Sequence, residues 1–136
     1  MKPIIATKFK KLQETGLEAE QYFMNNFQLI EAFKDATIED ARLYGDGYDF
    51  QISAQSNTYL AEVKGIRAKK GRFRLTENEY NKALEYQDDY IIALVLNLSF
   101  SPTLLMIENP TKNLSFEQKI VSSKSTKEYH LSEDIC

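Results

Sequence analysis

Apolar residues in the first part of the chain recur at the spacing of one helical face. They are Ala19, Phe23, Phe27 and Ile30. Just before them, Thr15-Gly16-Leu17-Glu18 matches a capping box, with Thr15 at the cap and Glu18 reaching back to it. We therefore predict a helix from Thr15 to about Lys34, and a short helix near Lys8–Glu14 is a further candidate.

The pattern then changes to the two-residue alternation of strands. In Tyr48–Ser53 every second residue is apolar, whereas Tyr90–Leu98 is a continuous apolar run that is typical of a buried strand. The residues Ala54-Gln55-Ser56-Asn57 read as a turn. The predicted strands are, in chain order, Thr37–Tyr44, Tyr48–Ser53, Thr58–Lys64, Tyr90–Leu98 and Leu104–Ile107.

A second capping box, Thr76-Glu77-Asn78-Glu79, opens another predicted helix that ends near Gln87. Its inner side is expected to carry Tyr80, Ala83, Leu84 and Gln87. The order of helix, three strands, helix and two strands predicts an α/β domain with a mixed sheet over residues 1–110. Residues 111–136 are polar and rich in Ser and Lys, so we expect a loosely attached extension with weak strand candidates at Glu117–Val121 and Glu128–Leu131.

The composition fits one domain of ordinary size. Its 136 residues are 43% hydrophobic and 27% charged, which is enough apolar material for one core and too much for a disordered chain. No apolar run has membrane-spanning length, and residues 1–8 lack the apolar stretch of a secretory signal. Cys136 is the only cysteine, which excludes an internal disulfide and a cysteine-based zinc site, so we expect a cytoplasmic protein. The net charge of −3 argues mildly against binding nucleic acid through broad electrostatics.

The predicted hairpin Tyr48–Lys64 carries the most informative polar residues. A four-residue turn pairs Ser53 with Thr58, and the same register places Asp49 opposite Glu62. Their Cβ atoms would then lie roughly 5 Å apart, on the face opposite Phe50, Ile52 and Val63. Lys64 follows on the same face, about 7 Å further along the strand.

Two facing carboxylates repel each other unless water or a cation offsets the repulsion. Oxygen ligands on a rigid hairpin suit Mg²⁺ or Mn²⁺, and a neighbouring lysine can orient or deprotonate a water or stabilise charge on a phosphate. This set therefore suggests cation-assisted hydrolysis of a phosphodiester. The alternative is an ordinary amphipathic hairpin with a solvated polar face, and a slip of one residue in the register would remove the site.

Other candidate residues are weaker. Glu20 lies at the edge of the apolar helix face, where it either turns outward or meets a site. Glu18 and Glu79 are assigned to their capping boxes, and the single histidine, His130, lies in the polar extension and is expected to have no part in catalysis. Asp46 is a weaker candidate ligand in the turn before Asp49.

Six of the eleven residues from Lys64 to Arg74 are basic. Such a segment is either a solvated loop or a loop that contacts phosphate. Its position directly after the strand with Glu62 favours the second interpretation. The expected nucleic-acid contacts are Arg67, Lys69, Lys70, Arg72 and Arg74.

The two hairpin segments, Gly47-Tyr48-Asp49-Phe50 and Tyr59-Leu60-Ala61-Glu62-Val63-Lys64-Gly65, resemble the Asp…Glu-x-Lys signature of PD-(D/E)XK nucleases. The flanking sequence resembles the domain named after the C-terminal part of protein NO VEIN, which is regarded as nuclease-like. It matches at Gly16-Leu17-Glu18-Ala19-Glu20, at Phe73–Tyr80 and at Ile107-Glu108-Asn109-Pro110. This resemblance spans about Gly16 to Pro110.

The resemblance implies a restriction-endonuclease-like fold with an αβββαβ core. It also implies that Asp49, Glu62 and the backbone carbonyl of Val63 bind Mg²⁺ or Mn²⁺. Lys64 would then assist the attacking water, and Glu20 would be a helix-borne acidic member of the same site.

We therefore expect a Mg²⁺-dependent endonuclease that acts on DNA, with RNA left open as a substrate and no membrane partner. Cutting both strands needs two active sites, which a homodimer would supply. One alternative is a catalytically silent module of the same fold that binds nucleic acid or a protein partner. Another is a structural subunit of a larger complex.

Overall fold

The computed structural model describes residues 4–121 and 126–135. Its main sheet has five strands in the order β1-β2-β3-β5-β6. Their bounds are β1 Thr37–Asp40, β2 Phe50–Ser53, β3 Thr58–Gly65, β5 Tyr90–Leu96 and β6 Thr103–Glu108. β3 and β5 pair in parallel and the other neighbours pair antiparallel, so the predicted mixed sheet of an α/β domain is confirmed.

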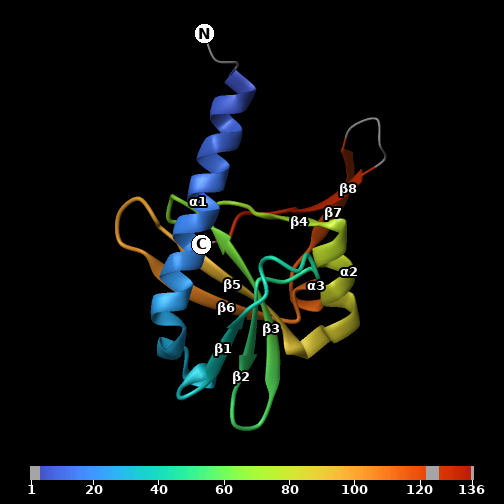
Figure 1. The fold of residues 1–136 in the computed structure, drawn as a ribbon. Coiled ribbons are helices and arrows are strands. Elements are labelled where there is room, and N and C mark those ends of the chain that lie inside the picture. The colour runs from blue at the N-terminus through green and yellow to red at the C-terminus, as the bar shows by residue number, and fades with distance from the viewer. Residues whose placement is uncertain (1–3, 122–125, 136) are drawn as a thin grey trace.

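Helices cover both faces of this sheet (Figure 1). α1 (Ile4–Asn26) packs on one face and α2 (Glu77–Tyr86) on the other, while α3 (Pro110–Asn113) is a single turn. Because successive strand residues point to opposite faces, Ala61 and Val63 join the core under α1 and Leu60 joins the core under α2. The strand β5 between the two cores is buried along its whole length.

α1 crosses β3 at close range because small residues meet there. A Cβ atom on Gly65 would lie 2.8 Å from the Cβ atom of Ala19, so this position requires glycine. Further along α1, Phe23 packs against Phe50 with ring centroids 5.6 Å apart. In the described ranges, no helix is both long and apolar enough to cross a membrane.

The predicted bounds of the first helix are wrong at both ends. α1 runs through Thr15 without a break, and it ends at Asn26, where two 3-10 turns follow, η1 (Phe27–Leu29) and η2 (Glu31–Phe33). Thr15 and Glu18 do not cap a helix. They lie on one face of the continuous helix, where both side chains bind Arg67. The spacing of a capping box is also the spacing of two neighbours on a helical surface, and the sequence pattern does not separate the two cases.

The second capping box is confirmed, because the Thr76 hydroxyl accepts from the Glu79 N–H and the Glu79 carboxylate accepts from the Thr76 N–H. The predicted inner face of α2 is only partly correct. Ala83 is buried, but Leu84 is 48% exposed and Gln87 is exposed beyond the end of the helix. The helix rests on its neighbours along a narrow stripe, which leaves Leu84 outside.

A second, three-stranded sheet joins the C-terminal segment to the segment before α2. It has the order β4-β8-β7, with β4 Arg74–Thr76, β7 Phe116–Val121 and β8 Thr126–Leu131. Tyr129 of β8 stacks on Tyr80 of α2 with centroids 3.7 Å apart, and Leu131 is 3% exposed. The expectation of a loosely attached segment after residue 110 is therefore wrong for its described part. The two strand candidates in this segment are confirmed, since β7 begins one residue before the predicted Glu117–Val121 and β8 begins two residues before the predicted Glu128–Leu131. Phe116 and Tyr129 both contact the ring of Tyr80 on α2.

The burial of Leu131 predicts a large loss of stability on truncation of this side chain. Leu131→Ala should lower the free energy of unfolding by about 2–4 kcal/mol, because it leaves a cavity in the core under α2. Leu29→Ala is the matched control, since Leu29 is 78% exposed and its truncation should change stability by less than about 0.5 kcal/mol. Urea denaturation of both variants measures this, and equal small losses would show that the segment does not pack.

Candidate active site

The hairpin β2–β3 has the predicted register, with Ser53 opposite Thr58 and Phe50 opposite Ala61. Asp49 lies one residue before β2, and its N–H donates to the carbonyl of Ala61 at 2.9 Å. Its carboxylate Oδ2 accepts the N–H of Val63 at 2.9 Å. The regular ladder therefore ends just before Asp49 and Glu62 would pair, and the Asp49 carboxylate is anchored on β3 beside Glu62.

Glu62 is the central charged group of the molecule. It is 4% exposed and is the one charged residue that is buried among the residues whose side chains are described. The Lys64 Nζ lies 3.4 Å from the Glu62 carboxylate. Burial raises the pKa of Glu62 well above its usual range, and Lys64 only partly offsets this effect. Burial alone would lower the pKa of Lys64, but the carboxylates of Glu62 and Glu79 raise it.

Glu79 is a member of this cluster that the sequence interpretation missed. Its Oε1 atom accepts from the Lys64 Nζ at 2.9 Å and also from the N–H of Thr76 at 3.0 Å. One carboxylate oxygen thus caps α2 and holds the lysine of β3. Although burial opposes the shift, Lys64 lowers the pKa of Glu79. The capping-box pattern identified the local role of Glu79 but not the strand that lies in front of it.

Glu20 of α1 enters the same region with a partner that was also missed. The Glu20 carboxylate lies 2.9 Å from Nη1 of Arg42, in the loop between β1 and β2. Arg42 also binds Asp40 at 2.6 Å and lies over the ring of Phe50. Hydrogen bonds from Arg42 lower the pKa of Asp40 to about 2. Glu20 therefore approaches Asp49 as half of an ion pair.

Acidic groups outnumber cationic groups in this region. Four carboxylates gather there, from Glu20, Asp49, Glu62 and Glu79, and they face the cations of Lys64 and Arg42. Burial raises the pKa of Asp49 to about 6, and the N–H of Val63 opposes this shift. Over residues 4–121 and 126–135, no three His, Cys, Asp or Glu side chains are already arranged to hold a metal ion.

Two cavities meet at Glu62. The smaller, about 230 Å³, is lined by Asp49, Glu79 and Arg42, and the larger, about 430 Å³, by Lys64, Glu20 and His130. His130 was assigned no role from the sequence, yet β8 places it in the wall of the larger cavity, 3.0 Å from Glu128. Asp46, the weaker candidate ligand, is exposed and lines neither cavity.

The basic segment after β3 is only partly free to bind an anion. Arg72 and Arg74 line the larger cavity. Three of the five predicted contacts already bind carboxylates: Arg67 binds Glu18, Arg72 binds Asp134 and Arg74 binds Glu128. Lys69 and Lys70 are exposed.

Comparison with known families gives one informative match. The family described as "Protein NO VEIN, C-terminal" matches residues 19–107, which is more than half of the chain. The chain belongs to this family. The NO VEIN C-terminal match contains Glu20, Arg42, Asp49, Glu62, Lys64 and Glu79, and it ends before β7 and β8. No curated protein and no solved structure matches the chain.

The raised pKa of Asp49 predicts a pH dependence of stability in the metal-free protein. Its pKa is about 6 in the folded chain against a usual value of 3.8, so the folded state binds the proton more tightly. This contribution is present at low pH and is lost as the pH rises through 6, which makes it worth about 1 kcal/mol between pH 5 and pH 7. Asp49→Asn should still accept the hydrogen bond from the N–H of Val63, but it should lack this gain in stability at low pH.

Urea denaturation in EDTA at pH 5 and pH 7 tests this expectation, with the exposed Asp46→Asn as the matched control. The control should gain stability between pH 7 and pH 5 as the parent does, and Asp49→Asn should gain less. Identical gains in all three proteins would contradict the burial of the Asp49 carboxylate.

The double role of Glu79 predicts that its charge stabilises the fold. Glu79→Gln keeps a side chain that can accept from the cap but removes the carboxylate that pairs with Lys64, so stability should fall by about 1–2 kcal/mol. Glu77→Gln makes the same change in the same helical turn and should be nearly neutral. Thermal and urea denaturation of both variants give the comparison, and equal effects would assign Glu79 to capping alone.

Proposed function

We propose that this NO VEIN C-terminal domain is a divalent-cation-dependent nuclease that hydrolyses phosphodiester bonds of DNA. The observation that carries the proposal is the placement of Glu62. It is buried beside Asp49, paired with Lys64, and opens on the two cavities. Two acids with a lysine on the same sheet face are also the Asp…Glu-x-Lys arrangement of PD-(D/E)XK nucleases.

The donor set fits Mg²⁺ or Mn²⁺. Magnesium is commonly held by one or two carboxylates together with water, so Asp49 and Glu62 suffice as side-chain ligands, and the Val63 carbonyl is the further expected ligand. Asp49 uses Oδ2 for the N–H of Val63, and in the described residues its second oxygen has no partner. Carboxylates outnumber cations in the region, and a divalent ion would offset part of this excess. A bound divalent ion would polarise a phosphoryl oxygen.

The residues of the chain supply the rest of the chemistry. The Lys64 ammonium, beside Glu62 and 17% exposed, can donate to a phosphate oxygen or hold the attacking water. Arg42 lines the same cavity as Asp49. It can form an ion pair with a phosphate once Glu20 leaves it and turns toward the bound divalent ion. In this proposal Arg72 and Arg74 exchange their carboxylate partners for the phosphates of the nucleic acid strand.

The second candidate is a catalytically silent module that binds nucleic acid or a protein. The carboxylate partners of Arg67, Arg72 and Arg74 favour it, because a phosphate must displace them. The net charge of −3 acts in the same direction.

Plasmid cleavage in Mg²⁺ or Mn²⁺ separates the two candidates. The parent should cleave, and Glu62→Gln and Lys64→Met should each lose at least about 100-fold in rate. Glu31→Gln and Lys34→Met make the same chemical changes at exposed positions and should keep full activity. A cation should also raise the melting temperature of the parent more than that of Glu62→Gln.

Two outcomes would contradict the nuclease. One is cleavage that Glu62→Gln and Lys64→Met retain. The other is no cleavage by the parent together with no thermal shift on addition of a cation, which would favour the silent module.

A further inference from the structure

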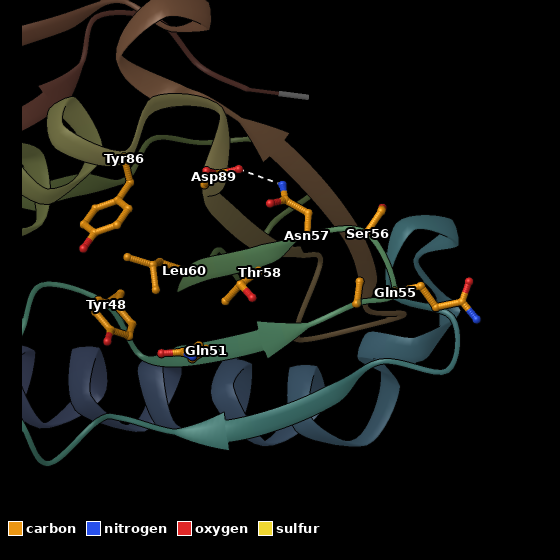
Figure 2. Close-up of a pocket in the computed structure, with 10 residues that line it drawn as sticks. Tyr48, Gln51, Gln55, Ser56, Asn57, Thr58, Leu60, Tyr86 and Asp89 are labelled. Atoms are coloured by element: carbon orange, nitrogen blue, oxygen red, sulfur yellow. Dashed lines mark hydrogen bonds between the residues drawn. The ribbon is translucent and has the colours of Figure 1, made fainter.

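A cavity of about 630 Å³ lies on the same sheet face as the acids, toward the β2–β3 turn (Figure 2). Gln51 and Leu60 are ladder partners at its floor. Gln51 is two residues after Asp49 and Leu60 two residues before Glu62, so this pair is one row, about 7 Å, from the acids. Tyr48 lines both this cavity and the smaller acidic cavity, which makes them neighbours.

The walls of this cavity combine aromatic rings with uncharged polar groups. Figure 2 shows Tyr86 and Tyr48 on opposite sides of a space into which Leu60 points. The Gln51 amide and the Thr58 hydroxyl lie further along the floor (Figure 2). Such a site fits a flat ring whose faces stack on tyrosine and whose edges accept and donate hydrogen bonds.

The charges of the cavity exclude a phosphate as its main occupant. Among the described residues that line it, Asp89 is the one carboxylate, and none is Lys or Arg. The Asp89 carboxylate accepts from the Asn57 amide at 2.7 Å. Lys82 lies just outside, 5.5 Å from the ring centroid of Tyr86. The cavity therefore suits a neutral ring, and any phosphate groups attached to that ring would lie outside the cavity.

We propose that this cavity is a subsite for an unpaired nucleobase of the strand whose phosphate is bound at Asp49 and Glu62. The proposal rests on the nuclease function and specifies the form of the substrate. A paired base has its faces and edge covered by its neighbours, so a base enters this cavity only from a single strand or an unpaired region. The cavity volume is ample for one nucleoside.

Binding of a short, dye-labelled single-stranded DNA in EDTA tests the subsite without catalysis. Fluorescence anisotropy should show weaker binding of the same strand made with abasic sites, and of the duplex. Tyr86→Ala should weaken binding of the natural strand by about 5- to 10-fold and leave the abasic strand unaffected. Tyr86→Phe keeps the ring and should bind as the parent does.

Phe100→Ala is the matched control, because it removes an 82% exposed aromatic ring from a residue outside the cavity lining and should not change binding. A thermal melt of Tyr86→Ala verifies that the variant is folded. Equal binding of natural and abasic strands, equal losses for both strands in Tyr86→Ala, or no DNA binding at all would overturn the subsite.

The failure of this proposal is distinguishable from failure of the nuclease. Base-dependent binding that needs Tyr86, with neither cleavage nor a thermal shift in Mg²⁺ or Mn²⁺, would support the subsite and contradict the enzyme. Cleavage that depends on Glu62, but in which Tyr86→Ala does not alter binding or the preference for single strands, would support the enzyme and overturn the subsite.

Discussion

A single buried carboxylate constrains how the layers of this domain fit together. Removing the charge of Glu62 from water costs several kcal/mol unless a partner offsets the cost, and Lys64 is the partner. Lys64 in turn is held by Glu79, which caps the first turn of α2. The helix must therefore begin directly in front of the end of β3. The position of α2, and of the second sheet that packs against it, follows from this requirement.

The same cluster reinforces the register of the central strand. In β3, Ala61 and Val63 face the aromatic core under α1, while Leu60, Glu62 and Lys64 face the other side. A slip of one residue would turn a carboxylate and an ammonium into the core that contains Phe23 and Phe50. Apolar packing and charge therefore select one alignment, and the four-residue turn Ala54–Asn57 agrees with it. When apolar packing, charge pairing and turn length all favour the same alignment, the chain has one stable structure.

Features that depend on residues close together in the sequence could be predicted from it. Features that depend on how distant helices and strands pack against one another could not. The hairpin register and the cap of α2 were correct because turn length and capping chemistry are local. Arg42 and His130 were not foreseen as parts of the site, since Arg42 meets Glu20 22 residues away and His130 reaches the cavity through the second sheet. The assignment of Thr15 and Glu18 to a capping box was wrong, because residues three apart are also neighbours on the surface of a continuous helix. The chemistry of a side chain limits which groups it can bind, but the packing of the helices and sheets decides which of them it contacts.

The second sheet also has a consequence for access to the site. Its strands β7 and β8 lie outside residues 19–107, which match the family, yet β8 contributes His130 to the wall of the cavity beside Glu62. β8 pairs with β4, and its side chains Tyr129 and Leu131 pack into the core under α2. The acids therefore come from the main sheet and its helices, while one wall of the cavity beside them comes from the second sheet. Any change that displaces β8 alters access to Glu62 without altering the acids themselves.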